Sequence, residues 1–302
     1  MGGNVFNCTS SIKKDWVRPT TQKFKEELSK LFPSATNYIF SMVLLGSAGK
    51  KDISGDIDLA MTNYAMNVDV WGLDQSRIEE LFYKFKKRAR SASDSQIYKR
   101  SVITLISEKI NNKSELIISS DEQSTNGVLF CNFPQYDESY NKTDLRVQID
   151  INIGRLDWLK FAYYSDEYSR NIKGLHRTQL MLAMFGYKGY VFSHNYGVKR
   201  KEDNKIIAIT PYEAITLLND EYHFLINDKI LSNYFELQNF IKVNISRDDL
   251  YGVYDRYLKA LDSTRCDIPE DLQSYWMQNQ DRLELKGKFL PEDSNLYILR
   301  KL

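Results

Sequence analysis

Several features that would mark a specialised class of protein are scarce in this sequence. Its 302 residues include three cysteines, Cys8, Cys131 and Cys266, which are odd in number and far apart. Neither a disulfide framework nor a cysteine-rich zinc site is therefore predicted. The 6 prolines and 14 glycines are too few for long linkers. Lys and Arg total 41 against 40 Asp and Glu, a net charge of +1, which excludes holding nucleic acid by bulk charge alone. This net charge does not exclude a local basic groove.

Long hydrophobic runs are also missing. No stretch of about 18 consecutive apolar residues is present, so no membrane-spanning helix and no membrane partner are predicted. The opening segment has no apolar core of the signal-peptide type, and we therefore expect an intracellular, cytoplasmic protein. The chain has an ordinary globular composition, with 42% hydrophobic and 27% charged residues. Its length predicts about two domains.

The periodicity of the apolar residues predicts an α+β protein. A short amphipathic helix is expected over 21–31, ended by Pro33, and residues before it are expected to be irregular. In the first half of the chain we further expect strands at 40–45 and 56–61, a helix over 73–90, and a strand-rich region over 99–153 that includes a strand at 99–106. In the second half we expect a helix over 171–186 and a hairpin with strands around Val191 and Ile206. A helix beginning at Thr210-Pro211 and further helices from about 225 to 286 are expected after it.

The pattern with the clearest chemistry is a Gly-Ser pair followed by two spaced acids. Gly46 and Ser47 come after a predicted buried strand, and SGDID, which holds Asp56 and Asp58, begins six residues later. Residues two apart on a strand share a face, so the two carboxylates repel each other unless a cation lies between them. Paired acids suit Mg²⁺, whose other ligands are commonly substrate phosphates. If Gly46 opens a helix, its N–H groups and the Ser47 hydroxyl can hold such a phosphate.

A third acid would complete a two-metal site. Asp150 lies between Ile149 and Ile151 in the alternating segment RVQIDINIG, and on an adjacent strand it would face the same way as the other two acids. Two ions at such a site activate a hydroxyl and stabilise a leaving pyrophosphate, which is nucleotidyl transfer. Taken singly, each part has an ordinary explanation, because Asp-x-Asp occurs by chance and Gly-Ser-Ala-Gly is commonly a plain turn. A Walker A loop is excluded, because Leu44 replaces its first glycine and Lys51 follows Lys50.

The segment LLGSAGKKDISGDIDLAM resembles the signature of the polymerase-β-type nucleotidyltransferases, in particular the family X DNA polymerases. QIDI (148–151) is similar to the strand that carries the family's third carboxylate, and HNYGVKRKEDNKIIAITPYEAITLL resembles the thumb hairpin. SDEYSRNIKGLH is similar to the helix that precedes this hairpin. The resemblance covers about residues 36–222, in the family's order.

The resemblance implies a set of site residues. Asp56, Asp58 and Asp150 would bind two Mg²⁺ or Mn²⁺ ions, with Asp150 helping to activate the attacking hydroxyl. The residues implied at the triphosphate are Gly46, Ser47, Ser54, Gly55 and one of Lys50 and Lys51; Asn171 and Lys173 match positions near the nascent base pair. The implied partners are a nucleoside triphosphate and a DNA or RNA 3′ end, and the implied setting is DNA repair.

The same resemblance gives the expected domain plan. We expect an N-terminal helical segment over 1–35, a nucleotidyltransferase palm with a mixed or antiparallel sheet over 36–165, a thumb-like α/β segment over 166–225 and a helical region over 226–302. No helix–hairpin–helix signature precedes the palm, and the first 35 residues are too short for the family's lyase and fingers domains. Untemplated transfer to RNA, protein or a small molecule therefore stays open, as does an inactive palm-fold protein with a binding or structural role.

Overall fold

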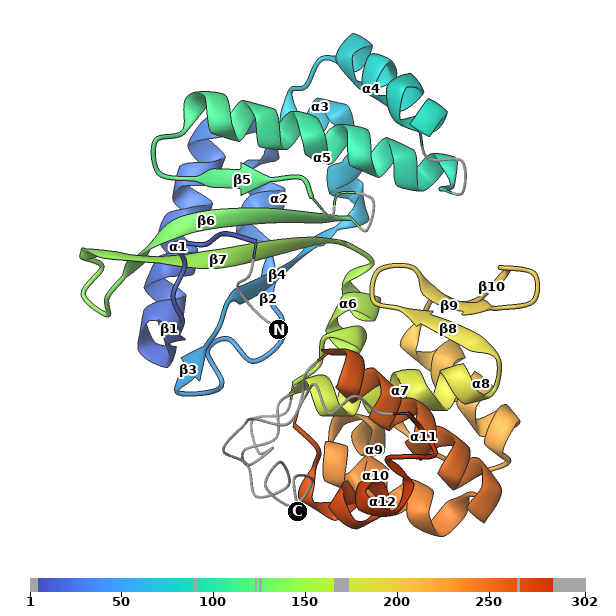
Figure 1. Cartoon of the computed structure of the whole chain (residues 1–302). Helices are drawn as coiled ribbons and strands as arrows, with labels where there is room; N and C mark the ends of the chain where they lie inside the picture. Colours follow the sequence, from blue (N-terminus) through green and yellow to red (C-terminus); the bar gives the residue numbers. More distant parts are fainter. Residues whose placement is uncertain are drawn as a thin grey trace. The chain divides into compact units, whose positions relative to one another are not determined.

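The structure is a computed structural model of the chain, and it describes residues 5–88, 92–122, 124, 127–165, 174–264 and 267–284. The chain divides into two compact units, Met1–Tyr163 (unit 1) and Tyr164–Leu302 (unit 2), which are coloured from blue to green and from yellow-green to red in Figure 1. Each unit contains both helices and strands, which confirms the expected combination of α and β structure.

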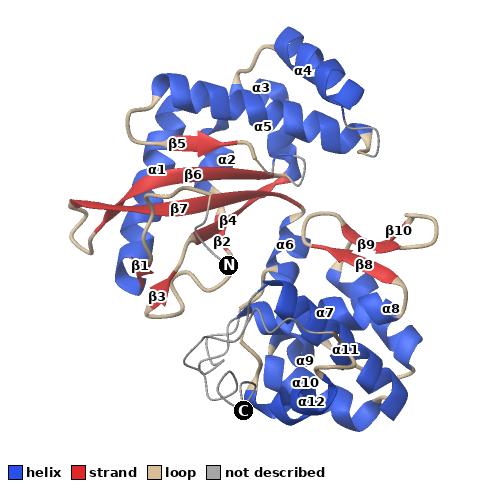
Figure 2. Ribbon diagram, viewed as in Figure 1, coloured by secondary structure: helices blue, strands red, loops and turns tan. Residues whose placement is uncertain are grey.

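Unit 1 is built on a five-stranded mixed sheet in the order β2-β4-β7-β6-β5. Its strands are β2 (Val43–Leu44), β4 (Ile57–Thr62), β5 (Ile118–Ser120), β6 (Val128–Tyr136) and β7 (Lys142–Gly154). The pair β4 and β7 is parallel, while the other neighbouring pairs are antiparallel. The two long strands β6 and β7 lie side by side (Figure 2). The sheet is therefore mixed, as the sequence predicted.

The two faces of this sheet have opposite character. Isoleucines at 149, 151 and 153 of β7 are buried in one core with residues of α1 (Lys14–Leu31) and α5 (Asp94–Lys113). The residues between and beside them, Gln148, Asp150 and Asn152, are polar. Side chains alternate along a strand, so this polar row lies on the face away from the helices. α6 (Leu156–Ala162) meets that other side, where Leu159 clusters with Leu45 and Ala60.

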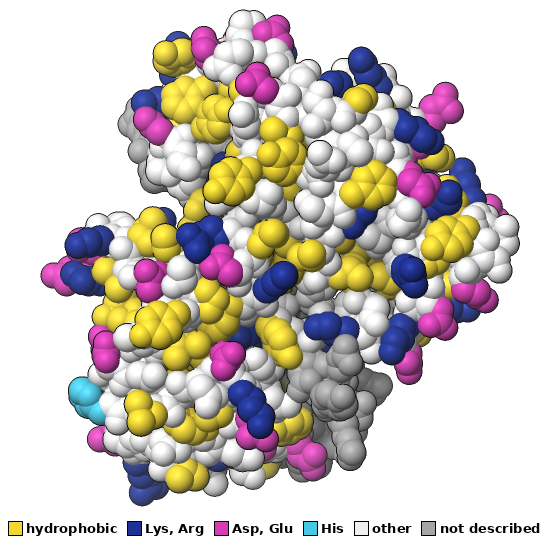
Figure 3. Space-filling model, turned by 180° about the vertical axis from the view of Figure 1, so that it is seen from behind, with side chains coloured by type: hydrophobic (Ala, Val, Ile, Leu, Met, Phe, Trp, Pro, Cys, Tyr) yellow, Lys and Arg dark blue, Asp and Glu magenta, His cyan; other side chains and the backbone are white. Residues whose placement is uncertain are grey.

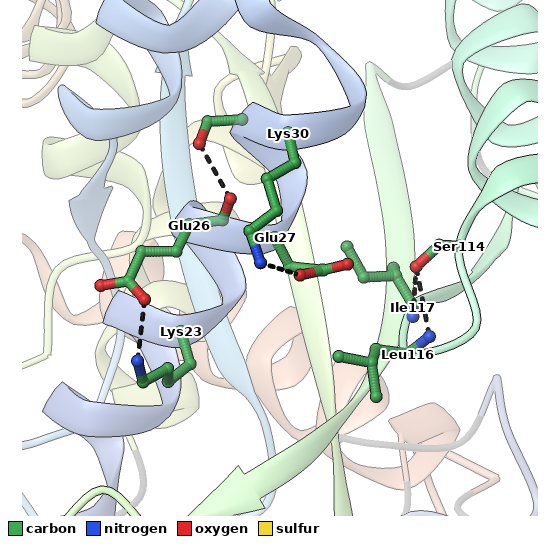
Figure 4. Close-up of polar contacts among 8 residues, drawn as sticks. Lys23, Glu26, Glu27, Lys30, Ser114, Leu116 and Ile117 are labelled. Atoms are coloured by element: carbon green, nitrogen blue, oxygen red, sulfur yellow. Dashed lines mark hydrogen bonds and ion pairs between the residues drawn. The ribbon is translucent and has the colours of Figure 1, made fainter.

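The helix predicted over 21–31 begins earlier than expected. α1 starts at Lys14, within the segment expected to be irregular, and runs through Pro19. Val17, Phe24 and Leu28 are buried along it, and this burial holds the first turns helical despite the proline. On its exposed side, Lys23 pairs with Glu26 and Lys30 with Glu27, each at 2.9 Å (Figure 4). Exposed ion pairs of this kind contribute little, so the packed side decides the helix.

The strand predicted at 99–106 is wrong, because these residues lie within the 20-residue helix α5. Its N-terminus has a capping box, in which the Ser93 hydroxyl accepts from the Gln96 N–H and the Gln96 side chain accepts from the Ser93 N–H. Ile103 and Ile106 are fully buried, and so is Ser101, which donates to the Ile97 carbonyl. A helix buried on most sides has no continuous polar stripe, so its β-branched run is easily mistaken for a strand.

Short elements complete unit 1. β1 (Ile12–Lys13) and β3 (Ile53–Ser54) form a small antiparallel ladder beside the main sheet, which ties the start of α1 to the residues just before Asp56. The others are η1 (Pro33–Ala35), α2 (Thr36–Phe40), η2 (Asn63–Met66), α3 (Val68–Trp71) and α4 (Gln75–Arg88). Pro33 thus ends α1 as predicted, and α4 agrees with the helix expected over 73–90 within a few residues.

Unit 2 is mainly helical and carries a small antiparallel sheet (Figure 2). The expected two-stranded hairpin has a third strand: β9 (Gly197–Arg200) lies between β8 (Tyr190–Ser193) and β10 (Ile206–Ala208). Thr210 caps α8 (Pro211–Tyr222) with the predicted capping box. The remaining elements are α7 (Gly174–Tyr187), α9 (Asp228–Ser232), α10 (Tyr234–Asn244), α11 (Arg247–Thr264), η4 (Glu270–Leu272) and α12 (Gln273–Asn279), so the prediction of helices after about residue 225 is confirmed.

The surface carries charges of both signs. On the face drawn in Figure 3, Lys and Arg side chains are interspersed with Asp and Glu, in keeping with the net charge of +1. Cys8 is an exposed free thiol and Cys131 a buried one, while Cys266 lies outside the described residues. Within the ranges that the structure describes, none of the helices is both long enough and apolar enough to cross a membrane.

Candidate active site

Asp58 and Asp150 stand opposite each other on two neighbouring parallel strands. The register of β4 and β7 pairs Asp58 with Asp150 and Ile57 with Ile149. The two isoleucines are fully buried in the helix-covered core, so the two aspartates lie together on the opposite face of the sheet. Asp56 lies in the bend directly before β4. The structure thus brings the three acids that the sequence singles out close enough for their charges to interact.

The charges of these acids interact strongly. Burial of the carboxyl group is the main cause that raises the pKa of Asp58 to about 7, and the charge of Asp56 adds to it. Burial also raises the pKa of Asp150 to about 8, with further contributions from Asp58 and then Asp56. Two carboxylates in such surroundings are costly to ionise together. A proton or a cation at this place relieves the repulsion.

Two neutral amides on β7 donate to the carboxylates. Gln148 Nε2 donates to Asp150 Oδ1 at 2.8 Å, and Asn152 Nδ2 donates more weakly to Asp58 Oδ1 at 3.5 Å. Each of these hydrogen bonds opposes the rise in the pKa of its carboxyl group, but burial outweighs it. The Tyr163 hydroxyl in turn donates to Asn152 Oδ1 at 2.9 Å. Asp58 and Asp150 therefore each have a neutral amide donor from β7 beside them.

Gly46 brings the backbone close to Asp58. Its φ is +63°, and a Cβ added there would lie 3.0 Å from Asp58 Oδ2, so glycine suits the position on both counts. The Gly46 N–H donates to the Tyr163 carbonyl at 3.1 Å. The Ser47 carbonyl accepts from the N–H groups of Lys50 and Lys51. Residues 46–50 form consecutive turns rather than the start of a helix, and some of their N–H groups are engaged within the protein.

The other residues predicted at a triphosphate lie in the loop between Gly46 and Asp56. Ser54 is paired with Ile12 through β3 and β1, and its buried Oγ has no hydrogen-bond partner among the described residues. Gly55 is exposed, while Lys50 and Lys51 are half-buried. Their contact with a phosphate stays a prediction. Asn171 and Lys173 lie outside the described residues.

The donor set fits a hard divalent cation. Three carboxylates whose charges interact offer the oxygen ligands that Mg²⁺ and Mn²⁺ prefer. Across the described ranges, no three His, Cys, Asp or Glu side chains are grouped closely enough to hold an ion by themselves. Mg²⁺ is commonly bound by one or two carboxylates together with substrate phosphates, and the glycine backbone beside Asp58 leaves space there that a side chain would fill.

Sequence reasoning missed three residues of this site. Gln148 and Asn152 could have been found, because they lie two residues on either side of Asp150 in a strand with alternating apolar positions. Tyr163 had no such signal, because it follows α6 and reaches the site only through tertiary packing. The alternation of this strand thus predicts that Gln148 and Asn152 lie on the same face as Asp150.

No family model and no curated protein sequence matches the chain. Among solved structures, two of DNA polymerase beta from Leishmania infantum are similar to it. A ternary P/T complex has a TM-score of 0.35 and 13% identity, covering 68% of this chain and 76% of that chain. A ternary gap complex has a TM-score of 0.33 and 11% identity, covering 69% and 73%.

Proposed function

We propose that this protein is a metal-dependent nucleotidyltransferase, which adds a nucleotide from a nucleoside triphosphate to a nucleic-acid 3′-hydroxyl. The observation that carries the proposal is the register of Asp58 opposite Asp150, with Asp56 directly before the same strand. Two independent sequence segments, about 90 residues apart, supply these acids. A sheet that serves only as a scaffold gains nothing from interacting carboxylates on neighbouring strands, since they destabilise it.

The proposed reaction makes one bond and breaks one. The 3′-oxygen of the acceptor bonds to the α-phosphorus of the triphosphate, and the bond from that phosphorus to the bridging oxygen of the β-phosphate breaks, releasing pyrophosphate. The proton of the hydroxyl would pass to Asp150, which is the proposed general base. Asp56, Asp58 and Asp150 would hold two Mg²⁺ or Mn²⁺ ions, which supply charge neutralisation at the triphosphate and a more acidic acceptor hydroxyl when bound.

The turn that begins at Gly46 is the proposed place of the triphosphate. Gly46 keeps side-chain atoms away from Asp58, and the buried Ser54 hydroxyl offers a donor without a partner among the described residues. Lys50 and Lys51 lie on the turn between them and can neutralise phosphate charge. These residues, together with Ser47 and Gly55, are the proposed triphosphate contacts.

The acceptor is proposed to be the 3′ end of DNA or RNA. A primer-extension experiment distinguishes templated from untemplated addition to this end. The purified protein is incubated with Mg²⁺ or Mn²⁺, each triphosphate in turn, and a labelled primer with and without a template strand. Extension that needs the template identifies a polymerase, while extension without it identifies a terminal transferase.

The variant that tests the site is Asp150→Asn, which keeps the size of the side chain and removes its charge. We expect incorporation to fall about a thousandfold, the order that several kcal/mol of transition-state stabilisation represents. The matched control is Asp144→Asn on the same strand, an exposed residue outside the site, which should leave incorporation unchanged. Equal activity of the two variants, or no incorporation into any acceptor by the wild type, contradicts the proposal.

A further inference from the structure

We propose that Tyr163 is a positioning residue, which orients the Asp58 carboxylate through Asn152 and fixes Gly46 through its backbone carbonyl. This inference rests on the proposed function, because it concerns the same acids. Three hydrogen bonds carry it. The Tyr163 hydroxyl donates to Asn152 Oδ1 at 2.9 Å, Asn152 Nδ2 donates to Asp58 Oδ1 at 3.5 Å, and the Gly46 N–H donates to the Tyr163 carbonyl at 3.1 Å.

The place of Tyr163 is fixed by the fold around it. It follows α6 directly as the C-cap, and its N–H donates to the Leu159 carbonyl at 2.9 Å. Its side chain packs against the small cluster of Leu45, Ala60 and Leu159, which joins β4 to α6. The apolar cluster therefore holds the Tyr163 ring in place, and the hydroxyl of that ring reaches Asn152 on the polar face of the sheet.

The acceptors beside Asn152 fix which way its amide points, and the Tyr163 hydroxyl holds it there. A tyrosine hydroxyl has one proton to donate, and the Asn152 oxygen accepts it. The amide nitrogen is thereby turned toward Asp58 Oδ1 and the Asp150 carbonyl, both of which are acceptors. If the amide rotated by half a turn, its oxygen would face these acceptors and repel them. By donating to Asn152 Oδ1, Tyr163 thus steadies the amide orientation in which the nitrogen faces the Asp58 carboxylate.

The same residue also sets the distance between Asp58 and the glycine backbone. The Gly46 N–H is bound to the Tyr163 carbonyl, and the position of a Cβ on Gly46 lies 3.0 Å from Asp58 Oδ2. One residue therefore holds the carboxylate from one side and the proposed triphosphate turn from the other. Residues that hydrogen-bond to metal ligands commonly strengthen metal binding, and their removal lowers the affinity by about 10- to 100-fold.

The experiment removes the hydroxyl and keeps the ring and the carbonyl. Binding of Mn²⁺ to the purified full chain is measured by calorimetry at pH 8 for the wild type, Tyr163→Phe and Tyr98→Phe. Tyr98 is the matched control, because its hydroxyl donates to the Met66 carbonyl in the same unit, away from the acids. We expect the Mn²⁺ dissociation constant to rise about tenfold in Tyr163→Phe and to stay within about twofold of the wild type in Tyr98→Phe.

A double-mutant cycle tests whether Tyr163 acts through Asn152. Asn152→Ala alone should weaken Mn²⁺ binding at least as much as Tyr163→Phe, and Tyr163→Phe added to Asn152→Ala should change it no further. Additive effects, or a Tyr163→Phe dissociation constant like that of Tyr98→Phe, overturn the inference while leaving the proposed function intact. A wild type that binds no Mn²⁺ overturns the proposed function and this inference together.

Discussion

Asp58 and Asp150 link the stability of the protein to pH in the direction opposite to that of most acidic residues. Their pKa values, about 7 and about 8, lie above the ordinary value of 3.8, so the native state binds more protons than the unfolded chain between about pH 4 and pH 8. The free energy of unfolding therefore falls as the pH rises through this range when no metal is present. We expect denaturant titrations in EDTA to show wild-type protein less stable at pH 8 than at pH 5.

Asp150→Asn isolates this effect from other titrating groups. His194 in unit 2 has a pKa lowered to about 4, chiefly by burial, which favours the native state as the pH rises from 4 to about 6.5 and so acts in the opposite direction. The wild type and the variant both contain His194. The difference between their free energies of unfolding therefore isolates the contribution of the acids. The variant should match the wild type at pH 5 and exceed its stability at pH 8. A variant that is less stable than the wild type at pH 8 would contradict the repulsion argued above.

At the scale of the helix, the close packing of α7 on α11 depends on Gly252. A Cβ at this position would lie 2.0 Å from Tyr187 Cε2, far inside any real contact. Gly252→Ala gains about 1 kcal/mol of helix propensity but overpacks the contact at a cost of about 1–3 kcal/mol. We expect a net loss of about 1 kcal/mol in the free energy of unfolding, measured by urea denaturation.

Gly186 in α7 provides the matched control for this prediction. Its Cβ would lie 3.7 Å from Arg256 Nη1, an ordinary contact in the same helix pair. Gly186→Ala should therefore be neutral or stabilising by up to about 1 kcal/mol. If both alanine variants had the same stability, the argument that Tyr187 excludes a side chain at Gly252 would be wrong.

The elements show where sequence patterns are reliable and where tertiary packing takes over. The start of α8 was predictable, because Thr210, Pro211 and Glu213 form a local cap that needs no other part of the chain. α5 was not, because burial on most sides removes the polar stripe that distinguishes a helix. The early start of α1 was also hidden, because Pro19 is a local signal against a helix and only the packing of Val17 outweighs it.

At the scale of the whole molecule, the acids of the site could be named from the sequence because strand alternation fixes the face of each one. Their meeting required the pairing of β4 with β7, and the register of Asp58 with Asp150 is a property of the sheet rather than of either segment. Tyr163 could not be named at all, because its contact with Asn152 depends on the packing of α6 against β4 and β7. The sequence therefore indicated the charges of the site but not the residues that orient them.

The division of the chain into two units predicts where a bound cation stabilises the protein. All three acids belong to unit 1, whereas α7 and α11 belong to unit 2. A cation at 100 times its dissociation constant adds about 2.7 kcal/mol to the state that binds it, which slows exchange through unfolding of that state about 100-fold. We expect Mn²⁺ at pH 8 to slow amide hydrogen exchange in β4 and β7 and to leave α7 and α11 unchanged.

Asp150→Asn is the control for this exchange experiment, because it removes a proposed ligand and leaves the strand pairing of β7 in place. Mn²⁺ should then slow exchange in β4 and β7 far less than in the wild type. Equal protection of both units in the wild type would contradict this prediction, because it would mean that the cation binds elsewhere or that the two units unfold together. Protection limited to β4 and β7, and lost in the variant, would locate the cation where Asp58 lies opposite Asp150.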